Sequence, residues 1–99
     1  MPDTDTFYDI FIIYDASDIR FVRRVDGHMK ANGLRCWVSW DDLSKTADGQ
    51  AVLRSGILRS HTVAIALSPK SAASQICNEL IQYAVNNSKR FVTLIVDEN

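Results

Sequence analysis

The stretch that decides the fold is YDIFIIY, residues 8–14, a nearly continuous run of β-branched and aromatic side chains. Such a run is typical of a strand that is buried on both faces of a parallel sheet. The polar segment DASD follows, and Ser17 or Asp18 is expected to cap a helix. That helix is predicted to reach Ala31, because apolar residues recur at helical spacing at Phe21, Val22, Val25 and Met29.

Short apolar runs and helical patterns continue to alternate along the rest of the chain. Further strands are expected at residues 34–38, 62–69 and 90–96, and further helices at about residues 50–59 and from Ser74 to near Asn87. Gly56 lies inside the first of these helices and costs it roughly 1 kcal/mol relative to alanine, so the helix is weak there or packs closely. This β-α alternation predicts an α/β domain with a parallel sheet, helices on both faces and right-handed crossovers.

Composition and charge narrow the class of protein. The chain has 99 residues, of which 46% are hydrophobic and 23% charged, as expected for one soluble globular domain. A net charge of -1 gives no indication of binding to nucleic acid or to an acidic membrane surface. No apolar run approaches the ~20 residues that span a bilayer. Cys36 and Cys77 form no CxxC pair, which favours reduced thiols and a cytoplasmic location.

Four segments together resemble one family. They are YDIFIIYDASD, GLRCWVSWDDLSKTAD, GILRSHTVAIALSPKSAAS and NNSKRFVTLIV, in this order and with compatible spacing over nearly all of the chain. The set is similar to the Toll/interleukin-1 receptor (TIR) domain. Two features, the Trp-Asp-Asp-Leu…Thr-Ala-Asp loop and the Ser-Pro-x-Ser turn, look most like bacterial members of that family.

The resemblance implies a flavodoxin-like three-layer sandwich with four parallel strands in the order 2-1-3-4. The fifth strand of the family is missing, so residues 1–99 are expected to be a C-terminally truncated TIR domain cut from a longer protein. Ligands of such sheets bind beyond the strand C-termini, at the point where the strand order reverses. Here that crevice would lie between residues 14–18 and residues 68–74.

The family implies two alternative functions. One is a signalling or defence module, in innate or anti-phage immunity, that self-associates and recruits other TIR domains. The other is an NAD+ glycohydrolase, activated by assembly, that cleaves the nicotinamide–ribose bond. In that enzyme NAD+ is the substrate, and a glutamate on the helix after the third strand stabilises the positive charge that develops on the ribose.

The register of that helix decides whether the glutamate is present. Counting back from Ala84 and forward from Cys77, both of which match the family pattern, places Leu80 where the enzyme has glutamate. Glu79 reaches that position only through a one-residue gap, which would rotate its side chain by about 100°. Glu79 is therefore the catalytic candidate only if the helix is irregular. A regular helix predicts a stripe that faces the sheet, at Cys77, Ile81, Ala84 and Val85.

Other candidate residues follow from the resemblance, and each has an ordinary structural alternative. Tyr14, Asp15 and Cys77 would line the crevice as substrate contacts, or be a strand end, a loop carboxylate and a packed cysteine. The indole of Trp40 could stack on a nicotinamide or adenine ring, or pack against the sheet. The same loop carries the contacts between TIR domains in the family, which gives an expected interface at Trp40, Asp41, Asp42 and Leu43.

Neither a metal nor a bound cofactor is expected. The two histidines and the scattered carboxylates lack metal-ligand spacing, and no glycine-rich phosphate loop is present. Cys77 has no histidine placed beside it as a base, since His28 belongs to the first helix and His61 precedes the third strand. A nucleophilic role for Cys77 is therefore not favoured.

Overall fold

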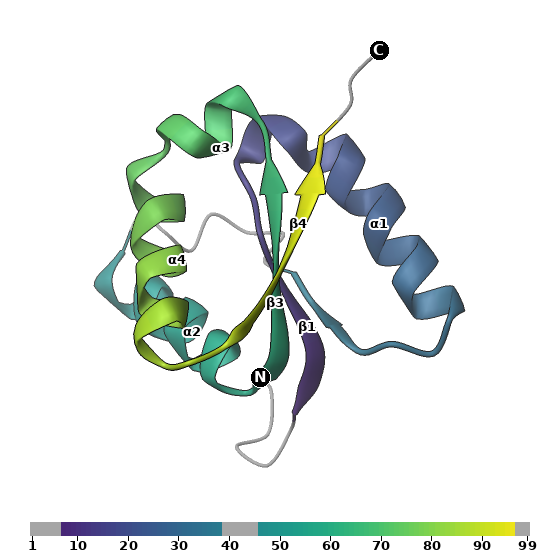
Figure 1. Cartoon of the computed structure of the whole chain (residues 1–99), viewed down its shortest axis with the longest axis horizontal. Coiled ribbons are helices and arrows are strands. Elements are labelled where there is room, and N and C mark those ends of the chain that lie inside the picture. The colour runs from purple at the N-terminus through teal and green to yellow at the C-terminus, as the bar shows by residue number, and fades with distance from the viewer. Residues whose placement is uncertain (1–6, 39–45, 97–99) are drawn as a thin grey trace.

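The computed structural model describes residues 7–38 and 46–96. Its elements are β1 (Tyr8–Ile13), the 3-10 turn η1 (Ala16–Asp18), α1 (Ile19–Ala31), β2 (Cys36–Trp37), α2 (Ala47–Leu58), β3 (Ser60–Leu67), α3 (Pro69–Ala73), α4 (Gln75–Asn86) and β4 (Arg90–Ile95). The four strands are all parallel and lie in the order β2-β1-β3-β4 (Figure 1). The predicted flavodoxin-like α/β fold and its strand order are confirmed.

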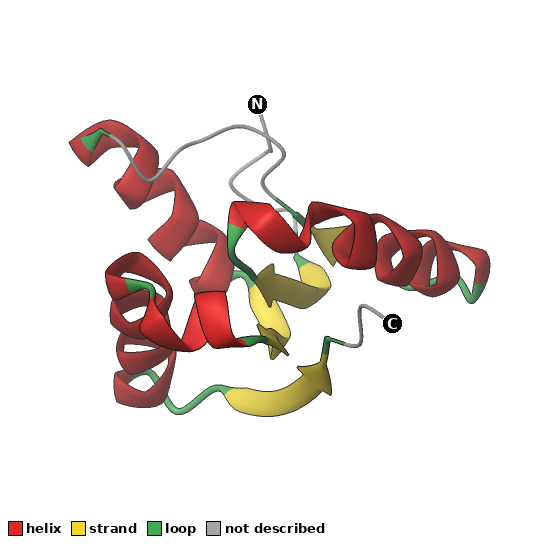
Figure 2. Cartoon of the chain, turned by 90° about the horizontal axis from the view of Figure 1, so that it is seen from above, coloured by secondary structure: helices red, strands yellow, loops and turns green. Residues whose placement is uncertain are grey.

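Helices cover both faces of the sheet, as the alternating sequence predicts. Helix α1 lies on one face, and α2 and α4 lie on the other, with α3 leading from β3 into α4 (Figures 1 and 2). The face under α1 holds one buried cluster, the α1-side core, formed by Ile12, Val22, Ala64 and Ala66. The opposite face holds the α4-side core, formed by Phe11, Ile13, Leu53, Ile57, Val63, Cys77, Leu80 and Ala84.

Strand β1 shows why its sequence is almost continuously apolar. Successive strand side chains point to opposite faces of a sheet. Ile12 therefore enters the α1-side core, whereas Phe11 and Ile13 on either side of it enter the α4-side core. β1 lies between β2 and β3, and none of its six residues is exposed.

Several predicted boundaries were wrong, and side-chain caps explain most of the differences. The second helix begins at Ala47 rather than near residue 50, because Thr46 Oγ1 accepts a hydrogen bond of 2.9 Å from the Gly49 N–H. The third strand ends at Leu67, and the short helix α3, which was not predicted, starts after it at Pro69. The second strand is limited to residues 36–37. The predicted cap at Ser74 is confirmed, since its Oγ accepts from the Cys77 N–H at 3.3 Å.

Gly56 packs closely against the sheet, which confirms one of the two expectations for it. A Cβ atom placed there would lie 2.8 Å from Phe11 Cε2 and 3.1 Å from Trp37 Cε2. The rings of Phe11 and Trp37 are themselves stacked, with centroids 4.8 Å apart. Because both rings are held in this stack, neither can move aside cheaply, and glycine lets α2 approach the sheet.

Exchanging glycines for alanine should therefore have opposite effects at two positions. Gly56→Ala is expected to lower the free energy of unfolding by about 1–3 kcal/mol, because the added methyl group overpacks the Phe11–Trp37 stack. Gly27 lies in α1, and a Cβ added there has no atom within 4 Å. Gly27→Ala should therefore raise the free energy of unfolding by about 0.5–1 kcal/mol. Urea unfolding followed by circular dichroism measures both. A stabilising Gly56→Ala would contradict the close packing.

Candidate functional site

The C-terminal ends of β1 and β3 carry a buried polar network. Ser68 Oγ donates a hydrogen bond of 2.5 Å to Asp18 Oδ2, which joins the segment after β1 to the segment after β3. Ser68 and Ser71 form a reciprocal capping box at the start of α3, and Ser71 Oγ also donates to the Ala66 carbonyl at 2.8 Å. Asp18, Ser68 and Ser71 are 3%, 8% and 3% exposed, respectively.

This network corrects the role predicted for Asp18. Asp18 stands at the N-cap position of α1, but its side chain makes no capping bond there and accepts from Ser68 instead. The cap of η1 is Asp15, which was not expected in that role. The Ser-Pro-x-Ser turn could have indicated the capping box from its spacing. The contact between Asp18 and Ser68 spans 50 positions in the sequence, and no local pattern could have revealed it.

Asp15 lies at the exit of β1 and is engaged locally. Its Oδ2 accepts hydrogen bonds from the N–H and the hydroxyl of Ser17. These two bonds lower the pKa of Asp15 below its ordinary value, and the positive charge of Lys70 acts in the same direction. Asp15 is therefore an ionised carboxylate at neutral pH, which suits an acceptor of hydrogen bonds and not a proton donor.

Tyr14 and Cys77, the other described substrate-contact candidates, both belong to the packing of the domain. Tyr14 is partly buried and packs against the α1-side core. Cys77 is 2% exposed within the α4-side core, and burial raises the pKa of its thiol. A buried thiol with a raised pKa is a poor nucleophile, as the sequence indicated. Substrate contact by these two residues and by Asp15 stays a prediction.

Helix α4 places Leu80 inward and Glu79 outward. Cys77, Leu80 and Ala84 are buried in the α4-side core at i, i+3 and i+7. Glu79 is exposed, and its Oε1 accepts a hydrogen bond of 3.0 Å from Gln75 Nε2, one turn earlier in the helix. The helix runs without a break from Gln75 to Asn86, so no irregularity turns Glu79 inward, and a catalytic role for Glu79 stays a prediction.

The predicted stripe of α4 is partly wrong. Val85 was expected to face the sheet, but it is 52% exposed, and Ile81 is only partly buried. Leu80 takes the central inward position instead. The expected stripe was centred roughly one residue too far along the helix, and helical spacing alone does not distinguish i+3 from i+4 as the next inward position.

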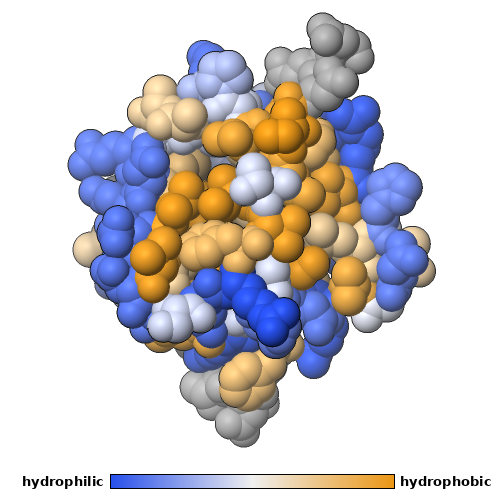
Figure 3. All heavy atoms as spheres, in the orientation of Figure 1, coloured by the Kyte–Doolittle hydropathy of each residue, from blue (hydrophilic) through white to orange (hydrophobic). Residues whose placement is uncertain are grey.

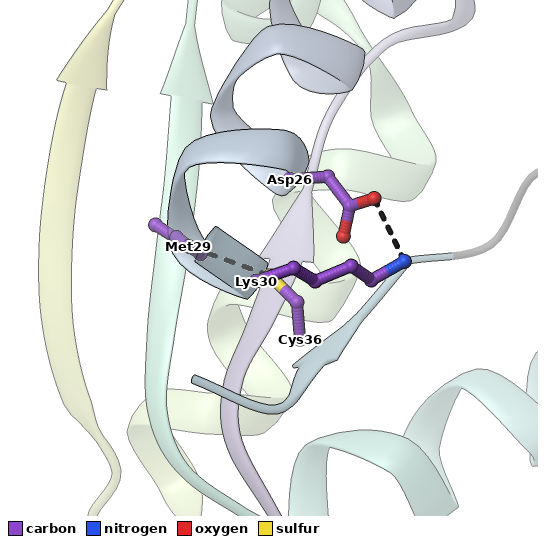
Figure 4. Close-up of polar contacts among 4 residues, drawn as sticks. All are labelled: Asp26, Met29, Lys30 and Cys36. Carbon is purple, nitrogen blue, oxygen red and sulfur yellow. Dashed lines mark hydrogen bonds and ion pairs between the residues drawn. The ribbon is translucent and has the colours of Figure 1, made fainter. Parts of the chain in front are cut away.

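The second cysteine, Cys36, belongs to β2 and packs against the α1-side core. Cys36 Sγ is 3.3 Å from Met29 Sδ, and Lys30 Nζ is 3.0 Å from Asp26 Oδ2 (Figure 4). Burial, aided by the negative charge of Asp26, raises the pKa of Cys36 to about 11. This thiol is therefore protonated at neutral pH and acts as a packing residue between α1 and β2. No group of histidine, cysteine and acidic side chains that could hold a metal ion occurs within residues 7–38 and 46–96.

Four of the candidate residues lie outside the described residues. They are Trp40, Asp41, Asp42 and Leu43, the expected interface, of which Trp40 is also the expected ring-stacking group. Their roles stay predictions. In the part of the chain that the structure does describe, no helix is both long and apolar enough to cross a bilayer.

The parallel sheet in the order β2-β1-β3-β4 and the helices on both of its faces define a flavodoxin-like domain. A sequence model of the TIR domain matches residues 10–99, and this chain belongs to the TIR domain family. Among solved structures it is similar to the TIR domain of the Toll-related receptor TRR-2 from the lower metazoan Hydra magnipapillata. The TM-score is 0.72 at 20% identity, over 93% of this chain and 73% of that one. No curated protein matches this chain significantly.

Removing the Ser68 hydroxyl should destabilise the domain more than removing an exposed hydroxyl nearby. Ser68→Ala leaves the buried Asp18 carboxylate without its hydrogen-bond donor and removes the cap of α3, so we expect a loss of about 1–3 kcal/mol in the free energy of unfolding. Ser17→Ala removes an exposed hydrogen-bond partner of Asp15. It should change the free energy of unfolding by no more than about 0.5 kcal/mol. Urea unfolding of both variants measures the difference, and equal losses would contradict a structural role for the Asp18–Ser68 bond.

Proposed function

We propose that this chain is a signalling or defence module of bacterial type, located in the cytoplasm, that acts by self-association with other TIR domains. The observation that carries the proposal is the buried Leu80 at the position where the resemblance requires a catalytic glutamate. A leucine side chain cannot stabilise the positive charge of an oxocarbenium-like transition state. The proposed function is therefore association and not chemistry.

The energetics of α4 support the same conclusion. Bringing Glu79 into the crevice would require rotating α4 by about 100° around its axis. Leu80 would then leave the α4-side core, at a cost of about 1.5–3 kcal/mol for its apolar surface. The Glu79 carboxylate would lose water and its bond with Gln75. Both terms oppose the rotation.

The hydrogen bonds of the two carboxylates after β1 also favour a structural role for this end of the sheet. The Asp18 carboxylate is buried and held by Ser68, and the Asp15 carboxylate is held by Ser17. Neither matches a glutamate that faces the ribose of NAD+. The alternative function, NAD+ cleavage, would have to use Glu79 together with Tyr14, Asp15, Trp40 and Cys77 as substrate contacts.

We place the association surface at Trp40, Asp41, Asp42 and Leu43, and the partner is another TIR domain, most simply a second copy of this chain. The segment combines a large aromatic side chain and a leucine with two carboxylates. Aromatic residues at the centre of an interface supply much of its binding energy, and flanking charges set orientation and specificity.

Two measurements on the same samples test this function. Sedimentation of the 99-residue chain over a wide concentration range should show reversible association, and Trp40→Ala should weaken it at least about tenfold. Glu79→Ala, which alters an exposed side chain of α4, serves as the matched control and should associate like the wild type. Nicotinamide release from NAD+, assayed at concentrations where the chain is assembled, should be absent in all three proteins.

The opposite outcomes contradict the proposal in separate ways. A chain that stays monomeric at every concentration would contradict self-association. Nicotinamide release that Glu79→Ala abolishes would establish the enzyme with Glu79 as its catalytic group. Release that persists in Glu79→Ala would show that another residue performs the chemistry.

A further inference from the structure

Two sulfur atoms of this chain lie in contact between α1 and β2. Cys36 Sγ is 3.3 Å from Met29 Sδ, and both side chains pack, partly buried, against the α1-side core (Figure 4). Thiol and thioether sulfurs are soft, polarisable donors, and a pair of them favours Cu(I) among the metal ions of biology. Such a pair can also be ordinary packing, so the groups around it decide what it can do.

Asp26 places a carboxylate oxygen without a partner beside this sulfur pair. Asp26 is 8% exposed, and its Oδ2 is 3.0 Å from Lys30 Nζ. Its Oδ1 is buried and has no hydrogen-bond partner among the described residues. In Figure 4 this second oxygen lies on the side of the carboxylate that is nearer to Cys36. Buried polar atoms almost always have a partner, so Oδ1 indicates that a cation or a donor binds there.

The surroundings of Oδ1 favour a cation over a water molecule. A buried water needs two to four polar partners. The atoms beside Oδ1 are the sulfurs of Cys36 and Met29, which are weak partners for water. The same sulfurs are strong ligands for a soft metal ion.

Regular backbone elements hold the three side chains in place. Asp26 and Met29 are three residues apart on α1, so they share one side of the helix. That side faces the sheet, whereas the outer side of α1, at the right of the view, is largely hydrophilic (Figure 3). After a turn at Gly33, where φ is 79°, the Leu34 N–H donates to the Met29 carbonyl at 2.9 Å. Cys36 then joins the sheet beside β1, so the donors are positioned by a helix, a closed turn and a sheet.

We propose that Cys36, Met29 and Asp26 bind one soft monovalent cation, Cu(I), through the two sulfurs and, as a third and weaker ligand, Asp26 Oδ1. On binding, the S–H bond of Cys36 breaks, a Cu–S bond forms and the proton leaves to solvent, while copper keeps its oxidation state. Replacing H⁺ by Cu⁺ leaves the net charge of the site unchanged, so no additional charge is buried. The unbranched side chain of Met29 can adjust the position of its sulfur to the length of a Cu–S bond.

The same geometry disfavours a divalent ion. Structural Zn²⁺ takes four ligands from cysteine, histidine and carboxylate, and no such group occurs within residues 7–38 and 46–96. The thioether of Met29 is what distinguishes the proposed site from those groups. The ammonium of Lys30, 3.0 Å from the other oxygen of Asp26, also repels a second unit of positive charge. Because Cys36 is only partly buried, an ion can reach its sulfur from solvent.

Titration of the 99-residue chain with Cu(I), without oxygen and in competition with the chelator bicinchoninate, tests the site. The wild-type chain should bind one Cu(I), and Cys36→Ser should lose this binding. Met29→Leu keeps an apolar side chain of similar volume and should weaken binding at least about tenfold, because losing a ligand costs no less than losing an outer-shell partner. Asp26→Asn, which removes the charge and keeps the shape, should weaken it by a smaller factor.

The other cysteine supplies the matched control. Cys77 is more deeply buried than Cys36, and its cluster contains neither a methionine nor a carboxylate. Cys77→Ala should therefore bind Cu(I) like the wild type. Circular dichroism shows which variants are folded, and only folded variants are compared.

X-ray absorption at the copper edge identifies the ligands in the wild-type chain, without any substitution. The spectrum should show two sulfur neighbours and one oxygen neighbour. When the methionines are replaced by selenomethionine, one of the sulfur neighbours should become selenium. The chain has two methionines, Met1 and Met29, so Met29→Leu, which retains Met1, should lose the selenium neighbour.

Several results would overturn the site. They are a wild-type chain that takes no Cu(I) from bicinchoninate, binding that Cys36→Ser leaves unchanged, and binding that folded Cys77→Ala loses. A copper spectrum without a selenium neighbour in the labelled chain would equally overturn it, because Met29 would then not be a ligand. None of these measurements depends on self-association or on NAD+ cleavage, so their failure leaves the proposed function standing.

Discussion

The stack of Phe11 on Trp37 is the interaction on which the rest of the structure depends. The two rings join β1 to β2 with centroids 4.8 Å apart and an interplanar angle of 16°. Helix α2 reaches them only because Gly56 has no side chain. Offset aromatic stacking adds about 0.5–1.5 kcal/mol beyond the area that the rings bury. Its larger effect is geometric, since it fixes the central strand relative to its edge strand and one covering helix.

Because β1 is fixed in the sheet, the position of the residues that follow its C-terminal end is fixed as well. The chain continues from β1 into η1. This places Asp18 within hydrogen-bond distance of Ser68, which follows the end of β3. The resulting buried hydrogen bond occupies the switch point of the sheet, where ligands of flavodoxin-like domains usually bind. Just beyond it, Ser74 starts α4 in the register that places Leu80 in the core. The segments that follow β1 and β3 therefore carry groups that stabilise the fold.

Sequence reasoning was reliable where the signal is local or periodic. The run through β1, the Ser74 cap and the inward positions of Cys77 and Ala84 were all predicted, because each depends on residues within one strand or two turns of helix. The strand order also followed, but from the family resemblance and not from the residues alone. The close packing of Gly56 was one of two alternatives, and only the position of Phe11 decides between them.

The sequence did not reveal features that depend on contacts between distant segments. The pairing of Asp18 with Ser68 joins residues 50 positions apart, so the local role of helix cap was the natural prediction for Asp18. The exposure of Val85 depends on how far α4 extends over the sheet, which its own pattern does not contain. Helix α3 was missed because five residues are too short to show periodicity.

The orientation of α4 is the central claim, and proton–proton distances test it most directly. In a methyl-labelled sample, nuclear Overhauser effects should connect the Leu80 methyl groups to side chains of the α4-side core, and the Glu79 side chain should show none to that core. Contacts from Glu79 to the α4-side core, with Leu80 exposed to solvent, would contradict the account and restore a carboxylate at the catalytic position.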